Sequence, residues 1–307
     1  MALNIVTILL KVLFRGLGAV NSKLKFPGRK KFGALTKKAF LDEISIISPR
    51  STAQLDHWRD ITIEIVEQVK SKDIDFLRNV WVRNALHTNQ YYFSYLYYKH
   101  LKKHYNYSQL QKLTGDVPFG NPLRDLIIKG ASPNSVKHFY LLDKISRHFQ
   151  MQLKNLDQII EFGGGYGSMC RIALSNLSIS QGVRWDIVDL PIMLALQKMY
   201  LNDSLLSDQV NQVQFHSDLN EIESINANSL FIATWSLSET PLELRASIED
   251  EVKKCRYIFI AFQEFYGSIS NLTYFQELWK NCPDHVGSLD ACPIYPGHYY
   301  LILEKKI

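Results

Sequence analysis

A glycine-rich turn in the second half of the chain carries the clearest chemical signature in the sequence. In IIEFGGGYGSMCRIA, an apolar run leads to Glu161, the glycines Gly163, Gly165 and Gly167 alternate through the turn, and a helical segment starts near Ser168. Because glycine has no Cβ, such a backbone turns sharply and passes close to a ligand. A loop of this kind between a strand and a helix predicts a cofactor site.

Two kinds of cofactor use such a loop, and the glycine spacing separates them. A dinucleotide site needs G-x-G-x-x-G, which brings the pyrophosphate to the helix N-terminus. Here the third glycine comes one position early, Ser168 takes the last glycine's place, and Glu161 would repel a pyrophosphate, so an NAD-type oxidoreductase is less favoured. The string E-x-G-x-G-x-G instead resembles the first motif of S-adenosylmethionine-dependent methyltransferases, whose cofactor has no phosphate and carries a cationic amino group.

Two further acids follow the next apolar runs, as this resemblance implies. DIVDLP places Asp189 28 residues after Glu161, about where nucleoside-binding folds keep an acid that accepts hydrogen bonds from both ribose hydroxyls. FHSD ends in Asp218, which resembles the acid that contacts the adenine amino group in this superfamily. The predicted cofactor-binding residues are therefore Glu161, Gly163, Gly165, Gly167, Asp189 and Asp218.

The elements around these residues predict an α/β fold. From Asp157 onward, short apolar runs such as QIIEF, SLFIATW and YIFIAF alternate with helical stretches, which is typical of a Rossmann-like, doubly wound sheet. Residues 52–113 contain no glycine or proline and predict two or three helices, and a further helix starts near Pro133. We expect an amphipathic helix and basic arm at 1–40, a helical region at 41–150, and a cofactor-binding methyltransferase domain at 151–307.

Four segments together resemble the sugar O-methyltransferases, bacterial enzymes of surface-polysaccharide gene clusters. These segments are SPNSVKHFYLLDKI, EFGGGYG, VDLP and SLSE, and the resemblance covers about residues 110–305. It implies a mostly parallel sheet with an antiparallel last strand and transfer of a methyl group to a sugar or glycan hydroxyl, in polysaccharide or glycolipid biosynthesis. Two alternatives stay open: an inactive scaffold subunit of a glycan-assembly complex, and an O-methyltransferase for a small molecule other than a sugar.

Methylation of a hydroxyl needs a group that removes its proton, and the sequence offers two candidate catalytic residues. Glu239 follows the fourth apolar run in ATWSLSETP, where its alternative role is to start a helix capped by Ser238. His298 begins the last run, GHYYLILEKK, and an antiparallel strand would bring it back to the active edge. The alternative for His298 is an exposed loop position.

Further residues at the same strand ends are candidates for binding the acceptor. Trp235 and Ser236 follow the fourth apolar run, and Gln263 and Tyr266 follow the fifth; such groups hydrogen-bond sugar hydroxyls or stack on a pyranose. No grouping of Asp, Asn and Glu ligands stands out there, so we expect the reaction to be metal-independent.

Composition sets the remaining expectations. The chain has 307 residues, of which 46% are hydrophobic and 21% charged, so it is globular. Its four cysteines form no CxxC pair, which favours a reducing, cytoplasmic compartment. Residues 1–38 carry nine Lys and Arg and no acid, whereas the rest holds 26 basic and 30 acidic residues, so a nucleic-acid partner is not expected.

The basic N-terminal segment leaves three interpretations open. Residues 4–20 have helical apolar spacing, and six Lys or Arg follow between Lys23 and Lys37. Residues 1–38 could thus make a peripheral contact with the anionic inner face of a membrane. They could instead pack on this chain or a second subunit, or serve as a targeting peptide. The sequence predicts no oligomeric state.

Overall fold

The computed structural model describes residues 10–17, 34–46, 56–70, 75–86, 91–177, 179 and 182–306. Of the predicted N-terminal helix, only residues 10–17 are described, and they are helical; the basic arm from 18 to 33 lies outside the described residues. Within the described ranges, no helix combines the length and the apolar character needed to cross a membrane.

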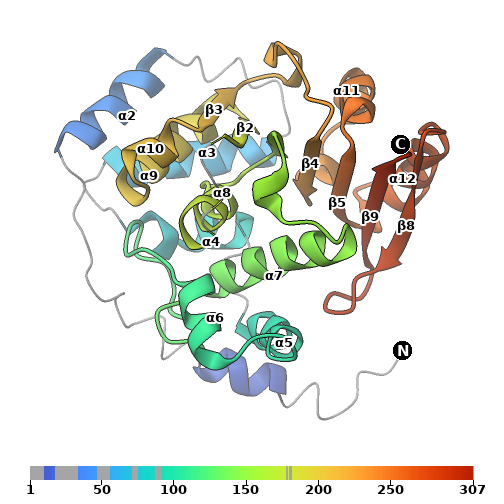
Figure 1. The fold of residues 1–307 in the computed structure, drawn as a ribbon. Helices are drawn as coiled ribbons and strands as arrows, with labels where there is room; N and C mark the ends of the chain where they lie inside the picture. Colours follow the sequence, from blue (N-terminus) through green and yellow to red (C-terminus); the bar gives the residue numbers. More distant parts are fainter. Residues whose placement is uncertain are drawn as a thin grey trace.

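A seven-stranded sheet forms the centre of the molecule (Figure 1). Its strands lie in the order β3-β2-β1-β4-β5-β9-β8. The first five strands are parallel, β9 runs antiparallel to β5, and β8 runs antiparallel to β9. The strand bounds are β1 (Gln158–Phe162), β2 (Arg184–Val188), β3 (Val213–His216), β4 (Ser229–Thr234), β5 (Tyr257–Gln263), β8 (His285–Ala291) and β9 (His298–Lys305). The predicted mostly parallel α/β sheet with an antiparallel last strand is confirmed.

Helices cover both faces of this sheet, because the central strands are apolar on both sides. In β1, Ile159 belongs to one buried cluster, together with helices α7, α8 and α9, and its neighbour Ile160 belongs to the other, with α11 and α12. Successive side chains of a strand point to opposite faces, so a strand between two helical layers is a continuous apolar run. The bounds of these helices are α7 (Pro133–His148), α8 (Ser168–Arg171), α9 (Pro191–Ser204), α11 (Leu242–Lys254) and α12 (Asn271–Lys280).

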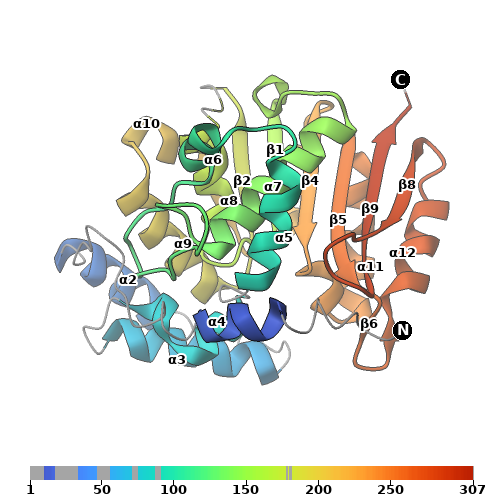
Figure 2. The same cartoon turned by 90° about the horizontal axis from the view of Figure 1, so that it is seen from below.

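The helical N-terminal region contains more elements than the two or three helices predicted for 52–113. Its elements are α2 (Ala34–Ile46), α3 (Asp56–Lys70), η1 (Phe76–Arg78), α4 (Val80–Ala85), α5 (Tyr91–Leu101) and α6 (Tyr107–Thr114). The short elements elsewhere in the chain are η2 (Leu153–Asn155), η3 (Ile172–Asn176), α10 (Ser207–Val210), η4 (Leu219–Glu221), η5 (Leu237–Glu239), and the two-residue strands β6 (Phe265–Tyr266) and β7 (Ile269–Ser270). Helices α3 and α4 lie across the edge where the parallel strands end (Figure 2). This region therefore lies against the edge at which ligands bind in open α/β sheets. The three-part domain division stays a prediction.

The helix of residues 10–17 packs on α5 through aromatic side chains. The ring of Phe14 stacks on Tyr95 at 5.2 Å between centroids and meets the edge of Tyr92 at 6.3 Å. On the same helix, Val12, Leu13 and other apolar side chains are exposed. Packing on the body thus accounts for only one side of this helix, and the predicted membrane contact stays a prediction.

Helix α7 starts at a well-defined position, which matters for the site below. The Ser132 hydroxyl accepts a hydrogen bond from the Ser135 amide at 3.1 Å, and Ser135 Oγ accepts one from the Ser132 amide at 2.9 Å. Pro133 occupies the first turn, where its fixed φ suits a helix and its missing N–H costs nothing. This reciprocal cap fixes where α7 begins, and the first turns of α7 line the same pocket as the end of β1.

Candidate functional site

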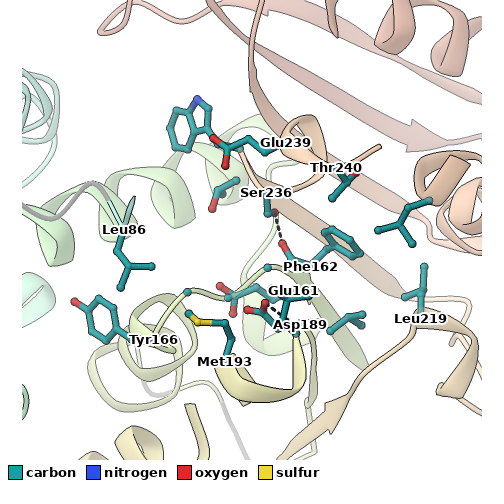
Figure 3. A pocket seen from close by; sticks show the side chains of 18 of the residues that line it. Leu86, Glu161, Phe162, Tyr166, Asp189, Met193, Leu219, Ser236, Glu239 and Thr240 are labelled. Carbon is teal, nitrogen blue, oxygen red and sulfur yellow. Dashed lines mark hydrogen bonds between the residues drawn. The ribbon is translucent and has the colours of Figure 1, made fainter. Parts of the chain in front are cut away.

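A pocket opens at the edge of the sheet where β1, β2, β3 and β4 end (Figure 3). The predicted residues Glu161, Gly163, Gly165, Asp189 and Asp218 all line it, as do Trp235, Ser236 and Glu239. Figure 3 shows Glu161 and Asp189 close together on one side, with Ser236 and Glu239 on another. Residues separated by almost eighty positions in sequence are brought together because parallel strands end at one edge.

The glycine loop needs left-handed backbone at the positions that approach neighbours most closely. Gly163 has φ +73°, and a Cβ there would lie 2.2 Å from Cβ of Ser236. Ser236 in turn donates a hydrogen bond from its hydroxyl to the carbonyl of Phe162 (Figure 3). The missing side chain at Gly163 thus lets the loop after β4 approach the loop after β1, and the hydrogen bond of Ser236 joins the two loops.

Gly165 and Gly167 serve different purposes. Gly165 has φ +60°, lines the pocket, and a Cβ there would meet only Leu86 Cδ2 at 3.5 Å. Gly167, with φ +90°, precedes α8, and its Cβ would lie 3.2 Å from Leu201. Gly167 does not line the pocket, so its predicted role in cofactor binding would be indirect.

Replacing Gly165 with valine is expected to abolish binding of S-adenosylhomocysteine, because the new side chain would point into the pocket. The left-handed backbone adds a strain of about 1–2 kcal/mol, which the body can tolerate. Gly267→Val is the matched control, since Gly267 has φ +57° and open space around its Cβ. Calorimetric titration of both variants is the measurement. Equal affinity in Gly165→Val and the parent chain would contradict the loop assignment.

Glu161 and Asp189 form a pair of acids beneath the loop. The pKa of Glu161 is raised to about 8, mainly by burial; a hydrogen bond from Trp185 Nε1 at 3.0 Å opposes the rise, and the neighbouring Asp189 adds to it. Burial also raises the pKa of Asp189 to about 7, although the amides of Leu190, Gly164 and Gly165 favour its ionised form. A cationic ligand would stabilise both carboxylates in their charged state.

Asp189 also organises its surroundings. One carboxylate oxygen accepts from the Leu190 amide at 2.8 Å, and the other accepts from Gln197 Nε2 at 2.7 Å. The same Gln197 nitrogen lies 2.9 Å from the carbonyl of Gly165 and donates to it. Asp218 also lines the pocket but is exposed, and it accepts a hydrogen bond from the Asn220 amide.

Trp235 holds an unusual backbone conformation at the end of β4. Its φ is +67°, a left-handed value that a bulky residue rarely adopts. The amide of Trp235 donates to Ala261 O at 2.7 Å, and its indole Nε1 donates to His298 Nδ1 at 2.7 Å, so two neighbouring strands hold it in place. Strained residues of this kind cluster at functional sites, because the surrounding structure must maintain them.

Glu239 presents a half-buried carboxylate to the pocket (Figure 3). It lies in η5, and α11 begins only at Leu242, so Ser238 does not cap that helix. The Ser238 hydroxyl instead lies within hydrogen-bond distance of two acceptors, Trp235 O at 2.6 Å and Gln263 Oε1 at 2.8 Å. Within the described ranges, the Glu239 carboxylate has no hydrogen-bond or ion-pair partner. Burial raises its pKa to about 7.

The other predicted residues lie behind this lining. His298 pairs with Gln263 across β9 and β5, and neither residue lines the pocket. Because Nδ1 of His298 accepts from an indole that can only donate, the imidazole proton sits on Nε2, and burial lowers the pKa of this histidine. Tyr266 does not line the pocket. Burial raises the pKa of its phenol, and the nearby charge of Glu239 raises it further.

Comparisons with known proteins add fold likeness only. No family model and no curated protein matches the chain. The chain is 13% identical to a SAM-dependent methyltransferase from Aquifex aeolicus, over 52% of this chain and 88% of that one, with a TM-score of 0.40. It is 13% identical to human N-acetylserotonin methyltransferase in complex with SAM, over 56% and 55% of the two chains, with a TM-score of 0.35. A 16S rRNA methylase is 12% identical over 69% of this chain and 97% of its own, with a TM-score of 0.37.

Sequence patterns did not single out one wall of the pocket. Asn134, Lys137 and His138 from the first turns of α7 line it, together with Leu86 and Tyr166. Asn134 Nδ2 donates to the Tyr166 hydroxyl at 3.0 Å, which ties α7 to the glycine loop. The segment SPNSVKHFYLLDKI marks the helix, but only its packing against the sheet shows which side chains reach the pocket.

Proposed function

We propose that this chain is an S-adenosylmethionine-dependent O-methyltransferase that acts on a sugar hydroxyl. The observation that carries the proposal is the pocket itself, where the glycine loop and Asp189 lie at the ends of β1 and β2. The carboxylate of Glu239, which has no partner among the described residues, follows β4. The resemblance of EFGGGYG, VDLP and SLSE to the sugar O-methyltransferases supports the acceptor class.

The residues present fit this cofactor. Gly165 leaves room beside the loop that a side chain would fill, and Asp189 offers carboxylate oxygens to the two ribose hydroxyls. We assign to Asp218, which lines the pocket after β3, the hydrogen bond from the adenine amino group. S-adenosylmethionine, when bound, supplies a methyl group on a cationic sulfonium, and the acid-rich lining suits that positive charge.

On the acceptor side, the chain must position a hydroxyl and take its proton. Glu239 suits the second task, because burial raises its pKa to about 7 and a general base works best when its pKa lies near the working pH. Trp235 offers an aromatic face of the kind on which sugars stack. His298, with its proton on Nε2, is better suited to hold the indole in place than to accept a proton.

The direct test is calorimetric titration of the full chain with S-adenosylhomocysteine, followed by a methylation screen. We expect S-adenosylhomocysteine to bind with a Kd below about 1 mM, and we expect no binding of NAD. Mass spectrometry of nucleotide sugars and lipid-linked glycans incubated with S-adenosylmethionine should reveal one added methyl group on a hydroxyl. Binding of NAD without S-adenosylhomocysteine would overturn the proposal, and cofactor binding without any methylation would favour an inactive scaffold.

A further inference from the structure

Lys137 is a buried cation in the wall of the pocket that α7 forms. Its side chain is 8% exposed and lines the pocket, and its Nζ lies 5.7 Å from the centre of the Trp235 ring. No hydrogen bond or ion pair joins it to any residue in the described part of the chain. Burial alone lowers the pKa of Lys137, to about 8, so it is still mainly protonated at neutral pH.

The position of Lys137 costs free energy in two ways. A buried ammonium loses hydration, and no carboxylate of the described ranges pairs with it to compensate for the loss. Lys137 also lies near the N-terminus of a 16-residue helix, where the helix dipole is positive and disfavours a cation. Both costs fall when an anion binds, so the arrangement favours an anionic ligand group.

The distribution of charge around the pocket indicates what kind of ligand carries the anionic group. Four carboxylates line it, those of Glu161, Asp189, Asp218 and Glu239, and among the described lining residues Lys137 is the only charged basic group. The adjacent His138 is neutral, because burial lowers its pKa well below the ordinary value and the charge of Lys137 lowers it further. A ligand that carries both cationic and anionic groups would therefore be oriented by this single positive wall.

S-adenosylmethionine is such a ligand, since its methionyl end carries a carboxylate beside the ammonium. We propose that Lys137 binds the methionyl carboxylate of the cofactor and so fixes which way the methionyl end points in the pocket. The inference rests on the proposed function. It assigns to α7 a positioning residue that acts with the glycine loop: the loop and acids hold the cationic and nucleoside parts, and Lys137 holds the anionic part.

The test compares two ligands that differ only in this carboxylate. S-adenosylhomocysteine has it, and S-adenosyl-3-thiopropylamine, its decarboxylated analogue, does not. Titration of Lys137→Met should show S-adenosylhomocysteine bound about 10- to 100-fold more weakly than by the parent chain, as expected for loss of a charge-assisted contact. The decarboxylated analogue should bind the parent chain and the variant with the same affinity.

Lys144→Met is the matched control, because Lys144 lies on the same helix and also contacts an aromatic ring, that of Tyr300, but does not line the pocket. It should change neither affinity. Thermal denaturation adds a second readout: removing a buried unpaired charge should leave the Tm of Lys137→Met equal to or above that of the parent chain. A purely structural lysine would instead lower the Tm and weaken both ligands alike, which would overturn the inference.

The two proposals fail in different ways. If the parent chain binds neither ligand, the methyltransferase assignment is wrong. If the parent chain binds S-adenosylhomocysteine and Lys137→Met binds it equally well, only the role of Lys137 is wrong, and an anionic group on the acceptor becomes the candidate partner.

Discussion

Replacing Glu239 with glutamine is expected to lower the turnover number by about 10² to 10⁴ and to leave the affinity for S-adenosylhomocysteine unchanged. Glutamine keeps the size of the side chain but cannot accept the proton of the acceptor hydroxyl. In the proposed arrangement the cofactor contacts the other side of the pocket, which Glu161 and Asp189 line. Methyl transfer to the acceptor found by the screen and titration with S-adenosylhomocysteine are the two measurements.

The pH dependence of the same reaction gives an independent check. The base must be ionised, and burial raises the pKa of Glu239 to about 7, so kcat/KM should fall as the pH drops below about 7. In Glu239→Gln this acidic limb should disappear along with most of the activity. The affinity for S-adenosylhomocysteine, measured across the same pH range, separates this limb from ionisation of Asp189.

His298→Gln is the comparison variant, since it removes the other candidate base. Loss of its hydrogen bond to Trp235 should disturb the acceptor side and produce a smaller decrease in turnover than Glu239→Gln. A larger effect in His298→Gln, with the acidic limb lost only there, would transfer the role of base to His298. Near parental rates in both variants would mean that another group or water takes the proton.

The strand ends of the site are predictable from sequence because their physical cause is local. Strands β1, β4 and β5 are covered on both faces and therefore appear as unbroken apolar runs, and the residues after each run must lie at one edge. Strand β8 (HVGSLDA) escapes this reasoning because it lies at the edge of the sheet, where only His285 of its seven residues is buried. It contains Gly287, where a Cβ would lie 1.9 Å from the carbonyl oxygen of Ile302. Its pairing is set by β9, not by its own pattern.

The acceptor side is harder to predict because tertiary contacts decide it. Nothing in the spacing of SPNSVKHFYLLDKI shows that Lys137 enters the pocket while Lys144 lies elsewhere along the same helix. Likewise, the sequence presents His298 as a candidate base, and only the indole of Trp235, 63 positions away, fixes its proton on Nε2. Side chains that depend on a partner from a distant element need the fold before their chemistry can be assigned.

Asp189→Ala is expected to weaken S-adenosylhomocysteine by about 1–3 kcal/mol, or about 5- to 150-fold in the dissociation constant. Two causes contribute: the ribose hydroxyls lose a charged acceptor, and Gln197 loses the partner that steadies the loop at Gly165. Asp189→Asn keeps the shape but not the charge. Because burial raises the pKa of Asp189 to about 7, the parent chain should bind more weakly as the pH falls below about 7, and Asp189→Asn should lack this dependence.

Gln197→Leu separates the two causes, because it removes the contacts to Asp189 and to the Gly165 carbonyl but leaves the Asp189 carboxylate in place. If Asp189 mainly binds ribose, Gln197→Leu should lose much less affinity than Asp189→Ala. Equal losses in the two variants would instead assign Asp189 to the architecture of the loop. A 2′-deoxy analogue of S-adenosylhomocysteine completes the comparison. The parent chain should bind this analogue more weakly than S-adenosylhomocysteine, and the difference in affinity should be smaller in Asp189→Ala, because the carboxylate that distinguishes the two ligands is then absent.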